Sequence, residues 1–173
     1  MENAVIAAIS MAIILGGTLT LMLGAIPSVD MLSTSWKEMA ERSGEIRRTE
    51  IAAYSYEISG AGDQVEIVVS NDGEVSLGDF DSWDVIVEYD SDTSSYAKWL
   101  PYTTSAPPEN NKWTVDGIYF DGSPESIEPN ILNPGEKMTI LVQLDPPVAK
   151  KTTNLATIST PNGVDTQIIF ERN

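Results

Sequence analysis

The sequence predicts an α+β protein in which a long N-terminal α-helix precedes an antiparallel β-sandwich. Two observations predict the helix: an uncharged run of 23 residues from Ala4 to Ile26, and an amphipathic stretch that continues to about residue 50. A third observation predicts the sandwich, because from Ala52 onward short alternating runs are separated by frequent turn signals. The expected domains are therefore residues 1–52, a polymerisation helix, and residues 53–173, an outer sandwich.

The uncharged run is long enough to cross a membrane as a helix, which takes roughly 20 residues. A cleavable secretory signal is the first alternative, but such a signal carries basic residues before its apolar part. The only charge that precedes this run is Glu2. We therefore expect a chain from which a leader has already been removed.

Small side chains recur at every fourth position of the run, a spacing that lets helices approach closely in an apolar medium. On a helix with 3.6 residues per turn, each step of four drifts by about 40°. The stripe therefore winds around the helix and suits several neighbours better than one. The alternative interpretation is a lone membrane anchor in which alanine and glycine are simply apolar. The candidate packing residues of this run are Ala4, Ala8, Ala12, Gly16, Thr20 and Gly24.

Pro27 follows the run, and we expect it to kink the helix because proline has no backbone N–H. Beyond it the pattern becomes amphipathic. A helix of about 50 residues would be on the order of 70 Å long, too long for this chain to bury alone. We add Leu32, Trp36 and Met39 to the candidate packing residues. The apolar positions at a/d spacing are Val29, Leu32, Trp36, Met39 and Ile46, with Ser43 in the intervening position.

Eight alternating runs in the second domain are expected to be strands, and we favour a sandwich of the immunoglobulin class. The first two runs form a hairpin around the turn at residues 60–63. The polar, proline-bearing stretch from Thr103 to Lys112 is expected to be an exposed loop. The expected strands are Tyr54–Ile58, Val65–Val69, Trp83–Tyr89, Tyr96–Tyr102, Trp113–Phe120, Lys137–Leu144, Thr153–Ser159 and Thr166–Phe170.

The composition narrows the function. The chain has 26 acidic and 10 basic residues, a net charge of -16, and such a surface repels nucleic acid. Residues 1–53 carry a net charge of -2 and the remainder -14, which indicates two regions with different surroundings. The chain has no histidine, the commonest general base, and no cysteine. It also lacks a phosphate loop, a nucleophile elbow and zinc-ligand spacing. We therefore expect a non-enzyme without catalytic, cofactor-binding or metal-binding residues.

Two clusters have an alternative interpretation. Carboxylates near a turn can bind calcium through oxygen ligands, but in so acidic a chain incidental clustering is the favoured interpretation. Three aromatic residues could form a sugar-binding surface, although packing in the core or between subunits is favoured. The carboxylates are Asp79, Asp81, Asp84, Asp90 and Asp92, and the aromatic residues are Trp99, Tyr102 and Trp113.

The N-terminal run ENAVIAAISMAIILGGTLTLMLGA, with the amphipathic stretch and β-rich domain after it, resembles the archaellins and related archaeal type IV pilins. The final segment ISTPNGVDTQIIFERN resembles the last strands of their domains, and VSNDGEVSLGDFDSWDVIV is similar to archaellar accessory proteins. The resemblance implies removal of a leader by a prepilin-type peptidase and residence in the membrane before assembly. It also implies an assembly ATPase and a membrane platform as partners.

The expected function is that of a structural subunit of an extracellular archaellum filament for motility, a helical homopolymer held together through residues 1 to about 50. Two alternatives stay open. The chain could be an adhesive type IV pilin, or a membrane-anchored accessory or stator protein of the archaellum that binds the cell envelope. An anchored surface enzyme or solute-binding domain is a third class.

Overall fold

The computed structural model describes the backbone of residues 2–173 and the side chains of residues 3–20 and 31–173. The chain forms two compact units, Met1–Gly44 and Glu45–Asn173. The first unit is helical, and the second contains the last turn of the same helix followed by the strands. The division of roles that we expect between residues 1–52 and 53–173 stays a prediction.

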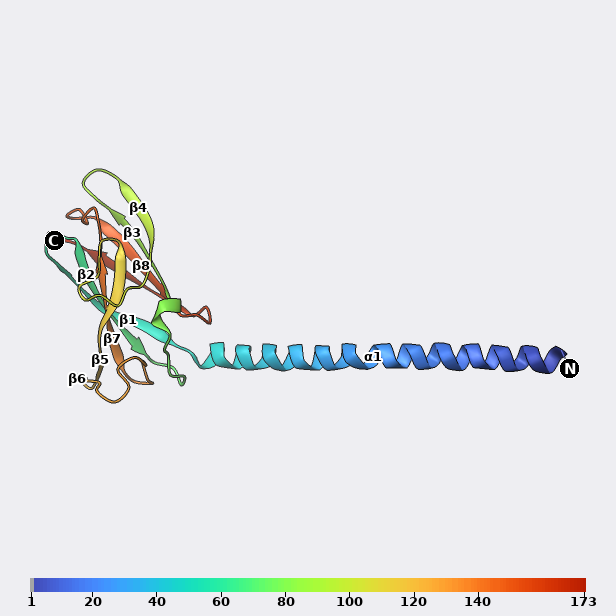
Figure 1. Cartoon of the computed structure of the whole chain (residues 1–173). Coiled ribbons are helices and arrows are strands. Elements are labelled where there is room, and N and C mark those ends of the chain that lie inside the picture. The colour runs from blue at the N-terminus through green and yellow to red at the C-terminus, as the bar shows by residue number, and fades with distance from the viewer. Residues whose placement is uncertain (1) are drawn as a thin grey trace. The chain divides into compact units, whose positions relative to one another are not determined.

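Helix α1 spans Glu2–Arg48 (Figure 1). Arg47 and Arg48 lie in its last turn, where the helix dipole favours positive charge. Thr49 directly follows the helix, and both its N–H and its hydroxyl donate to the carbonyl of Glu45, at 3.0 and 2.9 Å. The kink expected at Pro27 and the packing role expected of Gly24 fall within residues 21–30, outside the described side chains, and both stay predictions.

The strands form two antiparallel sheets, as the turn-rich alternating pattern predicts (Figure 1). One sheet has the order β1-β2-β7-β5-β6 and the other β4-β3-β8-β9. Strands β1, β2, β7 and β5 correspond to A, B, E and D of an immunoglobulin sandwich, and β4, β3, β8 and β9 to C′, C, F and G. The elements are β1 (Ile51–Ser59), β2 (Gln64–Asn71), the 3-10 helix η1 (Phe80–Ser82), β3 (Asp84–Asp90), β4 (Ser95–Leu100), β5 (Lys112–Phe120), β6 (Ser123–Pro124), β7 (Lys137–Gln143), β8 (Thr153–Ser159) and β9 (Asp165–Glu171).

Strand β1 forms an edge of the larger sheet, and its register shifts between Ala53 and Ser55. Such a bulge increases the local twist and bends the strand. The Ala53 N–H donates to the hydroxyl of Thr166 on β9 at 3.0 Å, and the Tyr56 ring packs against Phe170 of the same strand at 6.1 Å. Side-chain contacts therefore join the two sheets along this edge.

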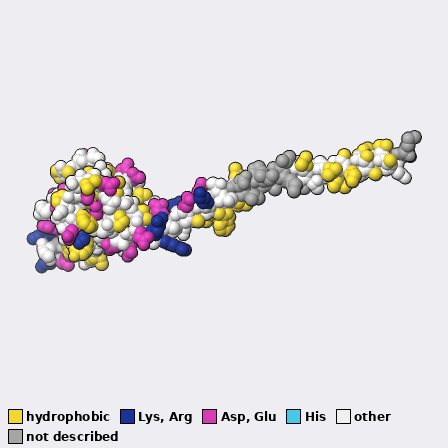
Figure 2. All heavy atoms as spheres, turned by 90° about the horizontal axis from the view of Figure 1, so that it is seen from below, with side chains coloured by type: hydrophobic (Ala, Val, Ile, Leu, Met, Phe, Trp, Pro, Cys, Tyr) yellow, Lys and Arg dark blue, Asp and Glu magenta, His cyan; other side chains and the backbone are white. Residues whose placement is uncertain are grey.

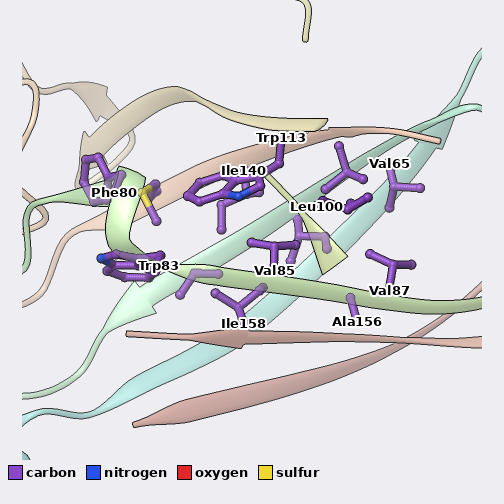
Figure 3. Close-up of a cluster of buried hydrophobic side chains, with 14 of the residues drawn as sticks. Val65, Phe80, Trp83, Val85, Val87, Leu100, Trp113, Ile140, Ala156 and Ile158 are labelled. Carbon is purple, nitrogen blue, oxygen red and sulfur yellow. The ribbon is translucent and has the colours of Figure 1, made fainter. Parts of the chain in front are cut away.

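The core lies between the two sheets (Figure 3). Trp113 and Ile140 of the larger sheet point toward Val85 and Ile158 of the smaller one, and all four are almost fully buried. Each large apolar side chain buried in this way contributes roughly 1.5–3 kcal/mol relative to exposure. At one end, Trp83 completes the core and its indole N–H donates to the Gly78 carbonyl at 2.9 Å.

Candidate functional site

The surface of α1 is the strongest candidate for a functional site. Ile13 and Ile14 are 68% and 65% exposed, although neighbouring residues point about 100° apart on a helix. Apolar side chains thus occur on several sides of the helix, and Figure 2 shows those of one face. A helix that is apolar all round is normally buried among other helices or in a membrane. The large apolar side chains exposed in its first half are Val5, Ile6, Ile9, Met11, Ile13, Ile14, Leu15 and Leu19.

Within α1, the segment Asn3–Thr20 has the length and composition of a membrane span. Its 18 residues have a mean hydropathy of 1.8, and none of the segment is buried by the chain. At 1.5 Å per residue, the segment extends about 27 Å, close to the thickness of a hydrocarbon layer. The segment suits either lipid or the apolar interior of an assembly.

The small-residue stripe lies on this exposed segment. Apart from the adjoining residues and the backbone of the same helical turns, no described atom lies within 4 Å of where a β-carbon on Gly16 or Gly17 would sit. The Thr20 hydroxyl donates to the Gly16 carbonyl at 2.8 Å, so it presents no unsatisfied polar group to a neighbour. The side chains of the stripe therefore protrude little from the helix, and the Thr20 hydroxyl needs no hydrogen bond from a neighbouring helix. The packing role of Ala4, Ala8, Ala12, Gly16 and Thr20 stays a prediction.

The second half of α1 separates apolar from charged positions. Leu32, Trp36 and Met39 are 59%, 70% and 67% exposed. Lys37 and Glu41 form an exposed i,i+4 ion pair at 3.8 Å, which contributes only a few tenths of a kcal/mol. This half of the helix therefore presents an apolar seam beside a solvated charged side, and its packing role also stays a prediction.

The last turn of α1 is fixed to the loop that follows β2 by main-chain hydrogen bonds. The Arg48 carbonyl accepts from the Glu74 N–H at 2.7 Å. The Glu50 carbonyl accepts from the N–H groups of Asp72 and Gly73, at 2.9 and 3.1 Å. The helix end and the sandwich are thus joined by three bonds that do not depend on side-chain identity.

Two asparagine side chains support this junction, and neither was singled out from the sequence. The Asn162 amide donates to the Thr49 hydroxyl at 2.7 Å. Asn71, which is fully buried, donates to the carbonyls of Val75 and Leu132 at 2.8 and 2.9 Å. The only signal in the sequence is the turn at each position, since the partner of Asn162 lies 113 residues away.

The three aromatic residues do not form one surface. Trp113 is fully buried in the core, and Tyr102 packs edge-on against it with 4.9 Å between ring centroids. Burial raises the pKa of Tyr102 above its ordinary value. Trp99 is 59% exposed on β4. The core-packing interpretation is confirmed for Trp113, and the sugar-binding surface is not formed.

The carboxylates considered for calcium do not form a cluster of ligands. Asp79 adopts a left-handed conformation at the start of η1, with a φ of 48°. Asp84 accepts a hydrogen bond from the Trp99 indole at 2.7 Å. Across the described residues, no group of three or more His, Cys, Asp or Glu side chains is placed to hold a metal ion. The geometry gives no support to a calcium site.

The chain matches no protein-family model and no curated protein sequence. It does match solved structures. In the archaeal flagellum of Methanospirillum hungatei strain JF1, a chain with 15% identity superposes with a TM-score of 0.55, over 99% of this chain and 92% of that one. This likeness includes α1 as well as the sandwich, since it spans nearly the whole sequence.

Two matches come from Sulfolobus acidocaldarius. The archaellum periplasmic stator protein FlaG is 20% identical, with a TM-score of 0.52 over 70% of this chain and 99% of its own. The stator complex of FlaF and FlaG gives 21% identity and a TM-score of 0.51, over 70% of this chain and 89% of that one. This chain therefore shares its fold with components of the archaellum.

Proposed function

We propose that this chain is a structural subunit of an archaellum-type filament. Helix α1 packs against α1 of other copies, and the acidic sandwich faces the outside. The observation that carries the proposal is the exposed apolar surface of α1 over residues 3–20, which one copy leaves uncovered. The likeness to the Methanospirillum filament supports it, because that likeness extends over helix and sandwich together.

The driving force for assembly depends on where the helix starts. From water, burying eight large apolar side chains contributes on the order of 10–20 kcal/mol before ordering costs. From a membrane, lipid already covers these side chains, so close packing must supply the gain. For assembly from a membrane, the winding stripe of alanine and glycine then contributes more than the large apolar side chains. It lets several neighbouring helices approach closely, whereas a lone anchor has no need of it.

Assembly on this pathway needs other proteins. A prepilin-type peptidase removes a leader, and α1 stays in the membrane until an assembly ATPase and a membrane platform transfer it into the filament. The finished filament is extracellular and serves motility. The strong negative charge of the sandwich keeps finished filaments soluble and apart.

A second candidate is a membrane-anchored accessory protein of the stator kind. The likeness to FlaG and to the FlaF–FlaG complex favours it, as does the suitability of Asn3–Thr20 for a single span. An adhesive type IV pilin would use the same assembly for attachment. A swimming assay on cells that lack the chain separates adhesion from motility.

Fractionation of the cell surface tests the proposal. Cells are sheared, and the chain is quantified in the released filaments and in the membranes. A filament subunit is the dominant protein of the sheared fraction, whereas a stator protein stays with the membranes. Filaments that lack the chain would contradict the proposal.

A further inference from the structure

The outer face of the sheet β4-β3-β8-β9 carries an exposed apolar band. Trp99 pairs across the strands with Ile86, and Leu155 pairs with Ile169 in the adjoining row. Trp99 and Ile169 are 59% and 64% exposed, and Ile86 is 37% exposed. Glu88 pairs with Leu155 and continues this second row onto β3. The band thus crosses all four strands.

The face is concave beside the band. An open groove of about 520 Å³ is lined in part by Glu88, Ala97, Leu155 and Ile169. A helix laid on a sheet is one of the stable ways to bury an apolar sheet face, and a hollow in that face leaves room for side chains of the helix. This band and groove are called the docking face.

The charged side chains at the outward-facing positions of these four strands are all acidic. Among the described outward-facing positions of these four strands, there is no Lys or Arg. The outer face of the other sheet differs, because Lys112 and Lys137 lie on it. A partner of the docking face should therefore combine an apolar surface with positive charge at its margins. The acids that border the docking face are Asp84, Glu88, Asp90, Asp165 and Glu171.

Trp99 is held in place on this face. Its indole N–H donates to the Asp84 carboxylate on the neighbouring strand at 2.7 Å. Holding the ring before binding lowers the entropy that an interface must lose. Large, restrained tryptophans are the side chains that most often dominate binding energy at protein interfaces.

The apolar seam of α1 combines the two properties that a partner of the docking face needs, an apolar surface and positive charge at its margins. On a helix of 100° per residue, Leu32, Trp36, Met39 and Ile46 lie within a sector of about 80°. Arg42 lies about 40° beyond one margin of that sector, beside Ile46, and Arg47 about 20° beyond the other, beside Trp36. The acids of this part of α1 lie on the opposite side of the helix and would point away from an acidic partner. They are Glu38, Glu41 and Glu45.

We propose that the seam of α1 in one copy docks on the docking face of a second copy. The inference rests on the proposed filament and adds the contact between a helix and a neighbouring sandwich. Leu32 to Ile46 extend about 21 Å along the helix, and four strands span about 15 Å across the sheet. The apolar surfaces therefore match in size, with arginine on both margins of one and carboxylates around the other.

Cross-linking of full-length chains tests the contact, because the chain has no cysteine of its own. One tagged copy carries Ser43→Cys, in the middle of the seam, and a second, differently tagged copy carries Thr157→Cys, in the middle of the docking face. A short bismaleimide is applied to intact cells. The expected result is a dimer that carries both tags. The matched control replaces Thr157→Cys with Thr139→Cys, an equally half-buried outward threonine on the other sheet, and yields only background.

Charge reversal tests the complementarity. Arg47→Glu in the Ser43→Cys copy is expected to lower the cross-linked yield about fivefold, and Glu88→Arg in the other copy restores it. Glu66→Arg, which makes the same change on the outer face of the larger sheet, does not restore it.

The outcomes separate this inference from the proposed function. Normal filaments in which the Ser43/Thr157 pair gives no more product than the control overturn the docking but leave the filament in place. Absence of filaments defeats the proposed function, and the same cross-link in membranes then decides the docking. Capture of a different protein by Thr157→Cys, instead of a second copy, also overturns it.

Discussion

Gly73 lies directly against the main chain of Arg48. A β-carbon on Gly73 would come within 2.5 Å of the Arg48 carbonyl oxygen and of the Glu50 nitrogen. Only glycine permits this approach, because main-chain atoms cannot move aside as a flexible side chain can. The loop after β2 and the last turn of α1 therefore form one block, and a load on the helix end reaches the sandwich through hydrogen bonds.

Gly73→Ala is expected to lower the free energy of unfolding by about 1–3 kcal/mol, the usual cost of forcing extra volume into a packed site. Thermal denaturation of the full chain in mild detergent measures the change. Gly78→Ala is the matched control, since its nearest described non-local atom would be 3.7 Å from the new carbon. Equal melting temperatures for the two variants would show that the close approach is unimportant.

Gly16→Leu and Ala12→Leu are expected to abolish or shorten the filaments. The chain itself leaves open space at Gly16, since a β-carbon there would meet no described atom within 4 Å outside the adjoining helix backbone, so any loss of assembly reports on neighbouring copies. Electron micrographs of sheared material provide the measurement. Thr20→Val keeps the size of its side chain and should assemble normally. Filaments of normal length and number from either leucine variant would refute the packing role of the stripe.

Tyr89→Phe is expected to leave the stability at neutral pH unchanged or to raise it by up to about 1 kcal/mol. The Tyr89 hydroxyl is buried and has no hydrogen-bond partner in the described part of the chain, so its removal eliminates a desolvation cost. Chemical denaturation of both proteins at pH 7 measures the effect. A large loss of stability would mean that the hydroxyl has a partner.

Tyr89 is also expected to make the folded protein less stable in alkali. Burial raises the pKa of Tyr89 from an ordinary 10.0 to about 12. Above pH 10, the unfolded chain releases this proton before the folded chain does, so the free energy of unfolding falls between pH 10 and 12. Tyr89→Phe should show a smaller fall over that range. Identical pH profiles for the two proteins would refute this assignment.

The strands were predictable because their side chains alternate. Val85, Val87 and Tyr89 are buried on one side of β3, as the period of two predicts. Strand β6 was not predicted, since the two residues Ser123–Pro124 are too short to show a period. The loop expected at residues 103–112 does connect β4 and β5 and is largely exposed.

The candidate site was only partly predictable. The surface of α1 is visible in the sequence, because a run without charge requires an apolar environment. The docking face is hidden, because alternation places Ile86 opposite Val85 and Val87 but does not reveal that Trp99 on β4 lies beside it. The junction is hidden as well, since Thr49 meets Asn162 only after the sandwich has folded.

The surroundings of α1 in native filaments decide whether this chain is a filament subunit. Filaments sheared from cells are reconstructed by cryo-electron microscopy to side-chain resolution. We expect that this chain forms the filament, that its residues 3–20 lie in the core, and that Gly16 contacts α1 of other copies. A filament built from a different protein, with this chain confined to the membrane, would contradict it.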